Sequence, residues 1–171
     1  MPDVPQLATE RLLLRAFAPG DFDAYAAMMA DPEVTRHLAV GRSMTRAEAW
    51  QQMAMFAGHW ALRGFGVCAV AERATGAFVG RIGGLEHEGW PAFEVAYTLA
   101  RPAWGRGYAR EGAAAALAYA RDVLGRREVV SVIRPGNAAS ARVARALGAE
   151  PGETVDFFGG PAVLYRYPPP R

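Results

Sequence analysis

A glycine-bearing segment in the middle of the chain has the composition of a phosphate-binding turn. Apolar residues up to Leu99 predict a strand, and Gly105 and Gly107 follow in a turn that opens a helix. Glycines let a backbone approach a ligand closely, and the unpaired N–H groups and positive dipole end of a helix N-terminus favour phosphate. Three arginines surround the same turn: Arg101, Arg106 and Arg110. The segment therefore predicts a phosphate-bearing ligand, or otherwise a plain tight connection between strand and helix.

Two nucleotide-binding patterns do not fit this segment. The dinucleotide pattern G-x-G-x-x-G/A places Arg110 where glycine or alanine is needed. A P-loop requires a lysine, and the basic residues of this chain are 19 arginines with no lysine.

The other reactive side chains indicate packing. Cys68 is the single cysteine and lies in an apolar stretch, which predicts a buried thiol. His37, His59 and His87 are far apart, so we expect no metal site. The arginines are dispersed and the net charge is only +2, which disfavours nucleic acid as a partner.

The composition predicts a globular protein with its own core. Apolar residues make up 51% and charged residues 21% of the 171 residues. No apolar run is long enough to span a membrane, and residues 1–5 do not look like a signal peptide. We therefore expect a cytoplasmic protein with no membrane partner.

The hydrophobic periodicity predicts an α+β (mixed α/β) fold in a single domain, 1–171, with a frayed tail at 168–171. About seven strands are expected, at 7–17, 65–72, 77–85, 92–100, 128–134, 154–158 and 162–167. About four helices are expected, at 21–30, 45–62, 107–124 and 137–147. A meander followed by a β-α-β crossover implies a mixed, mostly antiparallel sheet with one parallel pair.

Four motifs make the chain resemble one enzyme family. The run W-G-R-G-Y-A at 104–109 resembles the acetyl-CoA signature Q/R-x-x-G-x-G/A of the GNAT superfamily of N-acetyltransferases, although Trp104 departs at the first position. With Glu111 it is typical of the branch that acetylates ribosomal-protein N-termini. Three further segments resemble that branch: T-E-R-L-L-L-R at 9–15, D-P-E-V at 31–34, and N-A-A-S at 137–140 before L-G-A at 147–149.

The resemblance implies acetyl-CoA as cosubstrate, bound where two central parallel strands, 92–100 and 128–134, splay apart. The pyrophosphate is then expected on the turn that begins at Trp104, on residues Gly105, Arg106, Gly107, Tyr108 and Ala109. The pantetheine arm is expected along the backbone of Tyr97, Thr98 and Leu99. Asn137 should bind the arm from the other side, or cap the following helix, or do both.

The resemblance also implies direct acetyl transfer to an amine in a ternary complex. Glu94 is the first choice for the base that takes a proton from the amine, with Glu86 and Glu88 as weaker candidates. A backbone N–H near Ala96 or Tyr97 is the expected oxyanion donor. Many relatives place a tyrosine seven residues after the asparagine, but Ala144 stands there, so Ser140 is expected to stabilise the leaving thiolate.

The acceptor stays open between a protein N-terminal α-amine and a small-molecule amine. Its pocket should be walled by the first two helices, the loop 86–90 and the last hairpin. Five aromatic residues could shape it: Trp50, Trp60, Trp90, Phe157 and Phe158. The alternative function is a non-catalytic acyl-CoA-binding module, which needs no base. The family includes homodimers, so a dimer is compatible with the resemblance.

Overall fold

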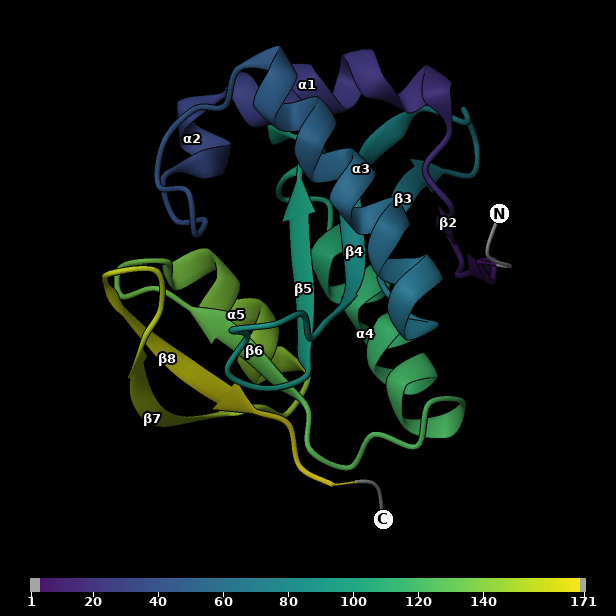
Figure 1. Ribbon diagram of the computed structural model, residues 1–171. Helices are drawn as coiled ribbons and strands as arrows, with labels where there is room; N and C mark the ends of the chain where they lie inside the picture. The colour runs from purple at the N-terminus through teal and green to yellow at the C-terminus, as the bar shows by residue number, and fades with distance from the viewer. Residues whose placement is uncertain (1–3, 170–171) are drawn as a thin grey trace.

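The computed structural model describes residues 4–169 and contains one mixed sheet with helices on both faces (Figure 1). The strands are β1 (Leu7–Ala8), β2 (Leu12–Arg15), β3 (Val67–Glu72), β4 (Phe78–Leu85), β5 (Glu94–Leu99), β6 (Val130–Ile133), β7 (Glu150–Asp156) and β8 (Pro161–Arg166). The helices are α1 (Phe22–Ala30), α2 (Pro32–Thr35), α3 (Arg46–Arg63), α4 (Tyr108–Asp122) and α5 (Ala138–Ala146), with 3-10 turns η1 (Pro19–Asp21) and η2 (Arg101–Ala103).

The eight strands follow the order β1-β2-β3-β4-β5-β6-β8-β7, and only β5 and β6 run parallel. The α+β fold class, the meander and the parallel crossover pair are therefore confirmed. There is one strand more than expected because the segment 7–17 folds back on itself. The N–H of Thr9 donates to the carbonyl of Leu12 at 2.9 Å, and β1 pairs with β2.

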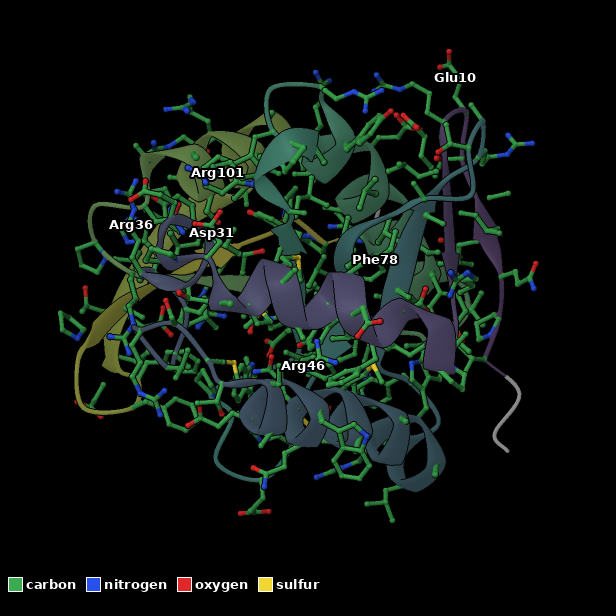
Figure 2. All side chains as sticks on the ribbon, turned by 90° about the horizontal axis from the view of Figure 1, so that it is seen from above. Glu10, Asp31, Arg36, Arg46, Phe78 and Arg101 are labelled. Carbon is green, nitrogen blue, oxygen red and sulfur yellow. The ribbon has the colours of Figure 1, made fainter. Side chains whose placement is uncertain are left out.

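There is also one helix more than expected, because Asp31 both ends α1 and begins α2. Its carboxylate accepts the N–H of Glu33 at 2.9 Å, and Pro32 occupies the first helical position. Asp31 also pairs with Arg101, just beyond β5, at 3.0 Å. Figure 2 shows these two side chains next to each other, so the D-P-E-V element ties α1 and α2 to the end of β5.

The two faces of the sheet carry different helices. Alternate residues of a strand face opposite sides, and β5 divides its side chains accordingly. Val95, Tyr97 and Leu99 join the core cluster under α4 and α5, whereas Ala96 packs in the cluster under α1 and α3. The two layers therefore meet at β5, which has a helix layer on each side.

The parallel pair separates almost at once. Glu94 opposite Val130 is the only registered pair between β5 and β6, and the two strands then diverge (Figure 1). Because a splayed pair leaves backbone groups of both strands without their ladder partners, side chains or ligands must take their place. This gap is the feature of the fold that the functional site uses.

The C-terminal tail was expected to fray from residue 168. Pro168 and Pro169 lie outside any strand, and the carbonyl of Pro168 accepts a hydrogen bond from Arg121. Residues 170–171 lie outside the described part of the chain. No helix among residues 4–169 is long and apolar enough to cross a membrane.

Candidate active site

An open cavity of about 360 Å³ lies at the gap between β5 and β6. Its walls come from β4, β5, β6, α3, the start of α5, the loops 37–40 and 87–90, and the tip of the β7–β8 hairpin. Of the predicted site residues it contains Glu94, Tyr97, Thr98, Asn137 and Ser140. Of the acceptor walls that the sequence predicted, the second predicted helix (α3), the loop 86–90 and the last hairpin contribute to this cavity, whereas α1 contributes no lining residue.

Glu94 lies at the base of the gap and is only 7% exposed. Its carboxylate accepts the indole N–H of Trp90 at 2.7 Å and the backbone N–H of Val132 at 3.2 Å. Val132 would donate to β5 in a continued parallel ladder, so the carboxylate replaces that backbone acceptor. Burial raises the pKa of Glu94 to about 7, and the two hydrogen bonds and the positive charge of Arg81 oppose that rise.

The other candidate bases do not reach the cavity. Glu86 pairs with Arg126 at 3.0 Å, and Glu88 is exposed in the loop. Glu111 accepts hydrogen bonds from the Thr9 hydroxyl and from the backbone and guanidinium of Arg11. Glu94 is therefore the one carboxyl group among residues 4–169 that lines the cavity.

Ser140 and Tyr97 form a pair of hydroxyl groups across the gap. The Tyr97 hydroxyl donates to the carbonyl of Ser140 at 3.0 Å, and Ser140 Oγ donates to the Tyr97 hydroxyl at 3.1 Å. Ala144, at the position where many relatives place a tyrosine, is fully buried in the core. Sequence reasoning used only the backbone of Tyr97, because a phenol in a strand carries no local signal that it reaches a neighbouring helix.

Asn137 begins α5, and its side-chain oxygen accepts the N–H of Ser140 at 3.1 Å. The capping role is therefore present, and the residue also lines the cavity.

The backbone of β5 offers one residue to the gap. Val130 N–H donates to the Phe93 carbonyl, so Val95, Tyr97 and Leu99 direct their backbone groups to the same side. The carbonyl of Val95 already accepts from the Ser131 hydroxyl at 2.7 Å, and the carbonyl of Leu99 accepts from the Trp104 indole at 2.8 Å. Thr98 pairs with β4 on the opposite side. Tyr97 is thus the residue whose backbone faces open space.

The glycine turn presents a row of backbone N–H groups before α4. Gly105 and Gly107 have φ values of 73° and 79°, which favour glycine. The N–H groups of residues 105–110 have no acceptor among residues 4–169. Arg11 holds the turn in place, since its guanidinium donates to the carbonyl of Arg106 at 2.8 Å and pairs with Glu111.

Glu72 holds the side chains of Arg106 and Tyr108 in place. The Arg106 guanidinium and the Tyr108 hydroxyl both donate to the Glu72 carboxylate. Ala109 lies half-buried in the first turn of α4. Trp104, 44% exposed, lies against the end of β5 and does not line the cavity.

The five aromatic residues that the sequence predicted for the acceptor pocket divide into two groups. Trp90, Phe157 and Phe158 line the cavity and contact one another, with ring centroids 4.9 to 5.7 Å apart. Trp60 is buried and donates to the carbonyl of Val67, and Trp50 is exposed on α3. Only the first three shape the cavity.

The single cysteine does not line the cavity. Burial raises the pKa of Cys68 to about 12, so it stays a protonated thiol. Among residues 4–169 there is no cluster of histidine, cysteine and acidic residues that could hold a metal ion.

Comparison with known proteins identifies the family. Residues 11–150 match the family described as "Acetyltransferase (GNAT) domain". The chain belongs to this family and is an acetyl-CoA-dependent N-acetyltransferase.

Its relatives include several acetyltransferases. It is similar to an acetyltransferase from Agrobacterium tumefaciens, with 32% identity, a TM-score of 0.87 and coverage of 96% and 95% of the two chains. It is 31% identical to the FsC-acetyl coenzyme A-N(2)-transacetylase of Aspergillus fumigatus, over 97% of this chain and 71% of that protein. RimL, a ribosomal L7/L12 α-N-protein acetyltransferase solved with coenzyme A, shares the fold, with 17% identity, a TM-score of 0.75 and coverage of 95% and 96%.

Proposed function

We propose that the chain transfers the acetyl group of acetyl-CoA to a primary amine, by direct attack of that amine in a ternary complex. The observation that carries the proposal is the buried Glu94 carboxylate at the base of the β5–β6 gap, facing an open cavity. The amine is a protein N-terminal α-amine or the amine of a small molecule. The similarity to RimL, an α-N-protein acetyltransferase, and to the N(2)-transacetylase supports these two classes.

The residues at the gap fit acetyl-CoA. The unpaired N–H groups of residues 105–110 suit its pyrophosphate, and a Cβ at Gly105 would meet nothing within 4 Å. The open backbone of Tyr97 suits the amides of the pantetheine arm, and Asn137 faces the same space. When bound, acetyl-CoA supplies an activated acetyl group, to which the amine nitrogen bonds as the carbon–sulfur bond breaks.

Glu94 takes the proton that the amine must lose. An α-amine with a pKa of about 7.7–8.0 is mostly protonated at neutral pH, so a nearby base increases the reactive fraction. A carboxyl group with a pKa of about 7 accepts a proton more readily than an exposed carboxylate does. The N–H of Tyr97 donates a hydrogen bond to the carbonyl oxygen of the acetyl group. The Ser140 hydroxyl rotates away from the Tyr97 oxygen and donates its hydrogen bond to the leaving thiolate, while Tyr97 holds the backbone of Ser140 in place.

The test is the rate of thiol release from acetyl-CoA with a panel of peptides and small amines, for wild type, Glu94→Gln and Glu88→Gln. Glu94→Gln should lower kcat by roughly 10²- to 10⁴-fold and leave the Kd for acetyl-CoA unchanged. The rate of wild type should rise with pH through about 7, as Glu94 loses its proton, whereas the variant should keep only the later rise that follows deprotonation of the amine itself.

Glu88→Gln removes an exposed carboxyl group from the neighbouring loop and should behave like wild type. Equal turnover by Glu94→Gln and wild type would remove Glu94 from the mechanism. Saturable binding of acetyl-CoA without turnover of any amine would instead favour an acyl-CoA-binding module.

A further inference from the structure

A buried arginine in the cavity wall has no anionic partner. Arg81 in β4 is only 5% exposed and lines the cavity. Its guanidinium lies 4.9 Å from the ring centroid of Phe56, its Nε has no hydrogen-bond partner, and no carboxylate among residues 4–169 lies within 4.0 Å. Buried charges are normally paired, because taking an unpaired charge out of water is costly.

The polar surroundings of Arg81 do not neutralise it. The hydroxyl of Tyr25 is close, and it donates its own proton to the side-chain oxygen of Gln52. Burial raises the pKa of Tyr25 and the charge of Arg81 opposes the rise, so the phenol stays neutral at physiological pH. The groups that contact Arg81 are therefore uncharged, and the Glu94 carboxyl group, whose pKa the charge of Arg81 lowers, acts on it without forming an ion pair.

Arg81 and Glu94 face the same side of the sheet. Arg81 is opposite Thr98 in the β4–β5 register, and Thr98 is four residues from Glu94, so the side chains of all three emerge on one face. Four residues of strand separate the two levels by roughly 13 Å. A long arginine side chain shortens that distance, which leaves room for an acceptor several bonds long between the two groups.

This position separates Arg81 from the phosphate-binding turn. Ala96, on the same face of β5, packs in the core cluster under α1 and α3, whereas α4 and its N-terminal turn contact the other face. The anion that Arg81 is placed to bind is thus on the acceptor side of the cavity.

We propose that Arg81 binds a carboxylate of the acceptor, so that the enzyme selects amines that carry a carboxylate several bonds from the reacting nitrogen. This inference rests on the proposed function and names its acceptor class. A planar guanidinium matches a carboxylate with two parallel hydrogen bonds. The amine end of the acceptor then lies at Glu94, beside the cavity-lining aromatic residues Trp90, Phe157 and Phe158.

The experiment uses matched acid and amide probes, which differ in whether they carry the carboxylate that Arg81 would bind. One arm compares 4-aminobutyrate and 6-aminohexanoate with their amides. The other compares C-terminally amidated Ala-Asp-Ala with its Ala-Asn-Ala counterpart. The first arm supplies a terminal carboxylate of a small molecule, and the second a side-chain carboxylate of a peptide N-terminus.

The first measured quantity is the acid-to-amide ratio of kcat/KM from thiol release. The second is the acid-to-amide ratio of binding affinities in saturating coenzyme A, followed by the change in tryptophan fluorescence. Wild type should favour the acid by roughly tenfold to a hundredfold in at least one arm. Arg81→Gln should bring that ratio close to one, and Arg81→Lys should keep part of it. Arg127→Gln removes the same charge from an exposed loop and should keep the wild-type ratio.

Folding of Arg81→Gln is checked by its affinity for acetyl-CoA and by a melting temperature within roughly 4 °C of wild type. Equal affinity and turnover of wild type for acid and amide in both arms, or a preference that survives in Arg81→Gln, would overturn the inference. Either result with active enzyme leaves the proposed function standing. If the enzyme acetylates none of the amines, that result would count against the proposed function. The ratios of binding affinity from fluorescence would still decide the role of Arg81.

Discussion

Burial gives the Glu94 carboxyl group a pKa of about 7, and that shift also affects folding. The folded state holds its proton up to about pH 7, whereas an unfolded glutamate releases it near 4.5. The stabilisation from this group is therefore complete below pH 4.5 and is lost as pH rises through 7. The difference corresponds to about 3 kcal/mol in the free energy of unfolding.

Glu94→Gln should consequently gain stability relative to wild type as the pH is raised from 4.5 to 8, by up to about 3 kcal/mol. Urea unfolding at several pH values measures the difference. The comparison variant Glu88→Gln, which lacks an exposed carboxyl group of the same loop, should follow wild type. A constant difference between Glu94→Gln and wild type over this range would contradict the burial argument.

The hydroxyl pair of Ser140 and Tyr97 should act as a unit. Tyr97→Phe and Ser140→Ala should each lower kcat by roughly tenfold, because each disrupts the hydroxyl pair that we propose stabilises the leaving thiolate. The double variant should lose little more than the worse single variant. Steady-state kinetics with saturating acetyl-CoA measures all three, and fully multiplicative losses would show that the hydroxyl groups act separately.

At the scale of elements, the turn before α4 is held in a shape that exposes its N–H groups. The T-E-R segment between β1 and β2 performs this task, because Thr9 and Arg11 bind Glu111 one turn into α4. The Arg11 guanidinium also reaches the carbonyl of Arg106. Two motifs about 100 residues apart are therefore parts of one structure.

The chain contains a matched pair of glycines that tests this turn. Gly105 and Gly125 both have positive φ, 73° and 66°, and a Cβ at either would meet nothing within 4 Å. Alanine at either position should cost about 1–2 kcal/mol of stability. Only Gly105→Ala should also weaken acetyl-CoA binding, by roughly tenfold, in calorimetric titration. Equal affinities of the two variants would show that the turn does not bind the cosubstrate.

At the scale of the whole molecule, periodicity and turn residues predicted most of the fold. The meander and the crossover follow from alternating apolar residues between clear turn and cap signals, such as Thr45 with Glu48 at the start of α3. The sequence did not predict the extra strand and the extra helix, because each depends on the hydrogen bonds of a single residue. Hydrogen bonds between Thr9 and Leu12 make the fold-back, and hydrogen bonds from residues 33–35 to Asp31 begin the short helix.

The site was predictable where motifs carry it and not where tertiary packing assembles it. Glu94 could be chosen because it is the only acid in its strand. The burial that raises its pKa, the contact between Tyr97 and Ser140, and the lack of an ion-pair partner for Arg81 arise from neighbours that are distant in the chain. Local sequence contains no signal for such contacts.

The central claim is that acetyl-CoA lies between β5 and β6 with its phosphates on the turn before α4. Amide hydrogen exchange with and without acetyl-CoA tests it most directly, because the N–H groups of residues 105–110 have no acceptor within the described chain, 4–169. We predict slower exchange on binding in peptides that cover 95–99 and 104–110, with little change in β1 to β3. Unchanged exchange at both segments, with acetyl-CoA bound, would contradict the account.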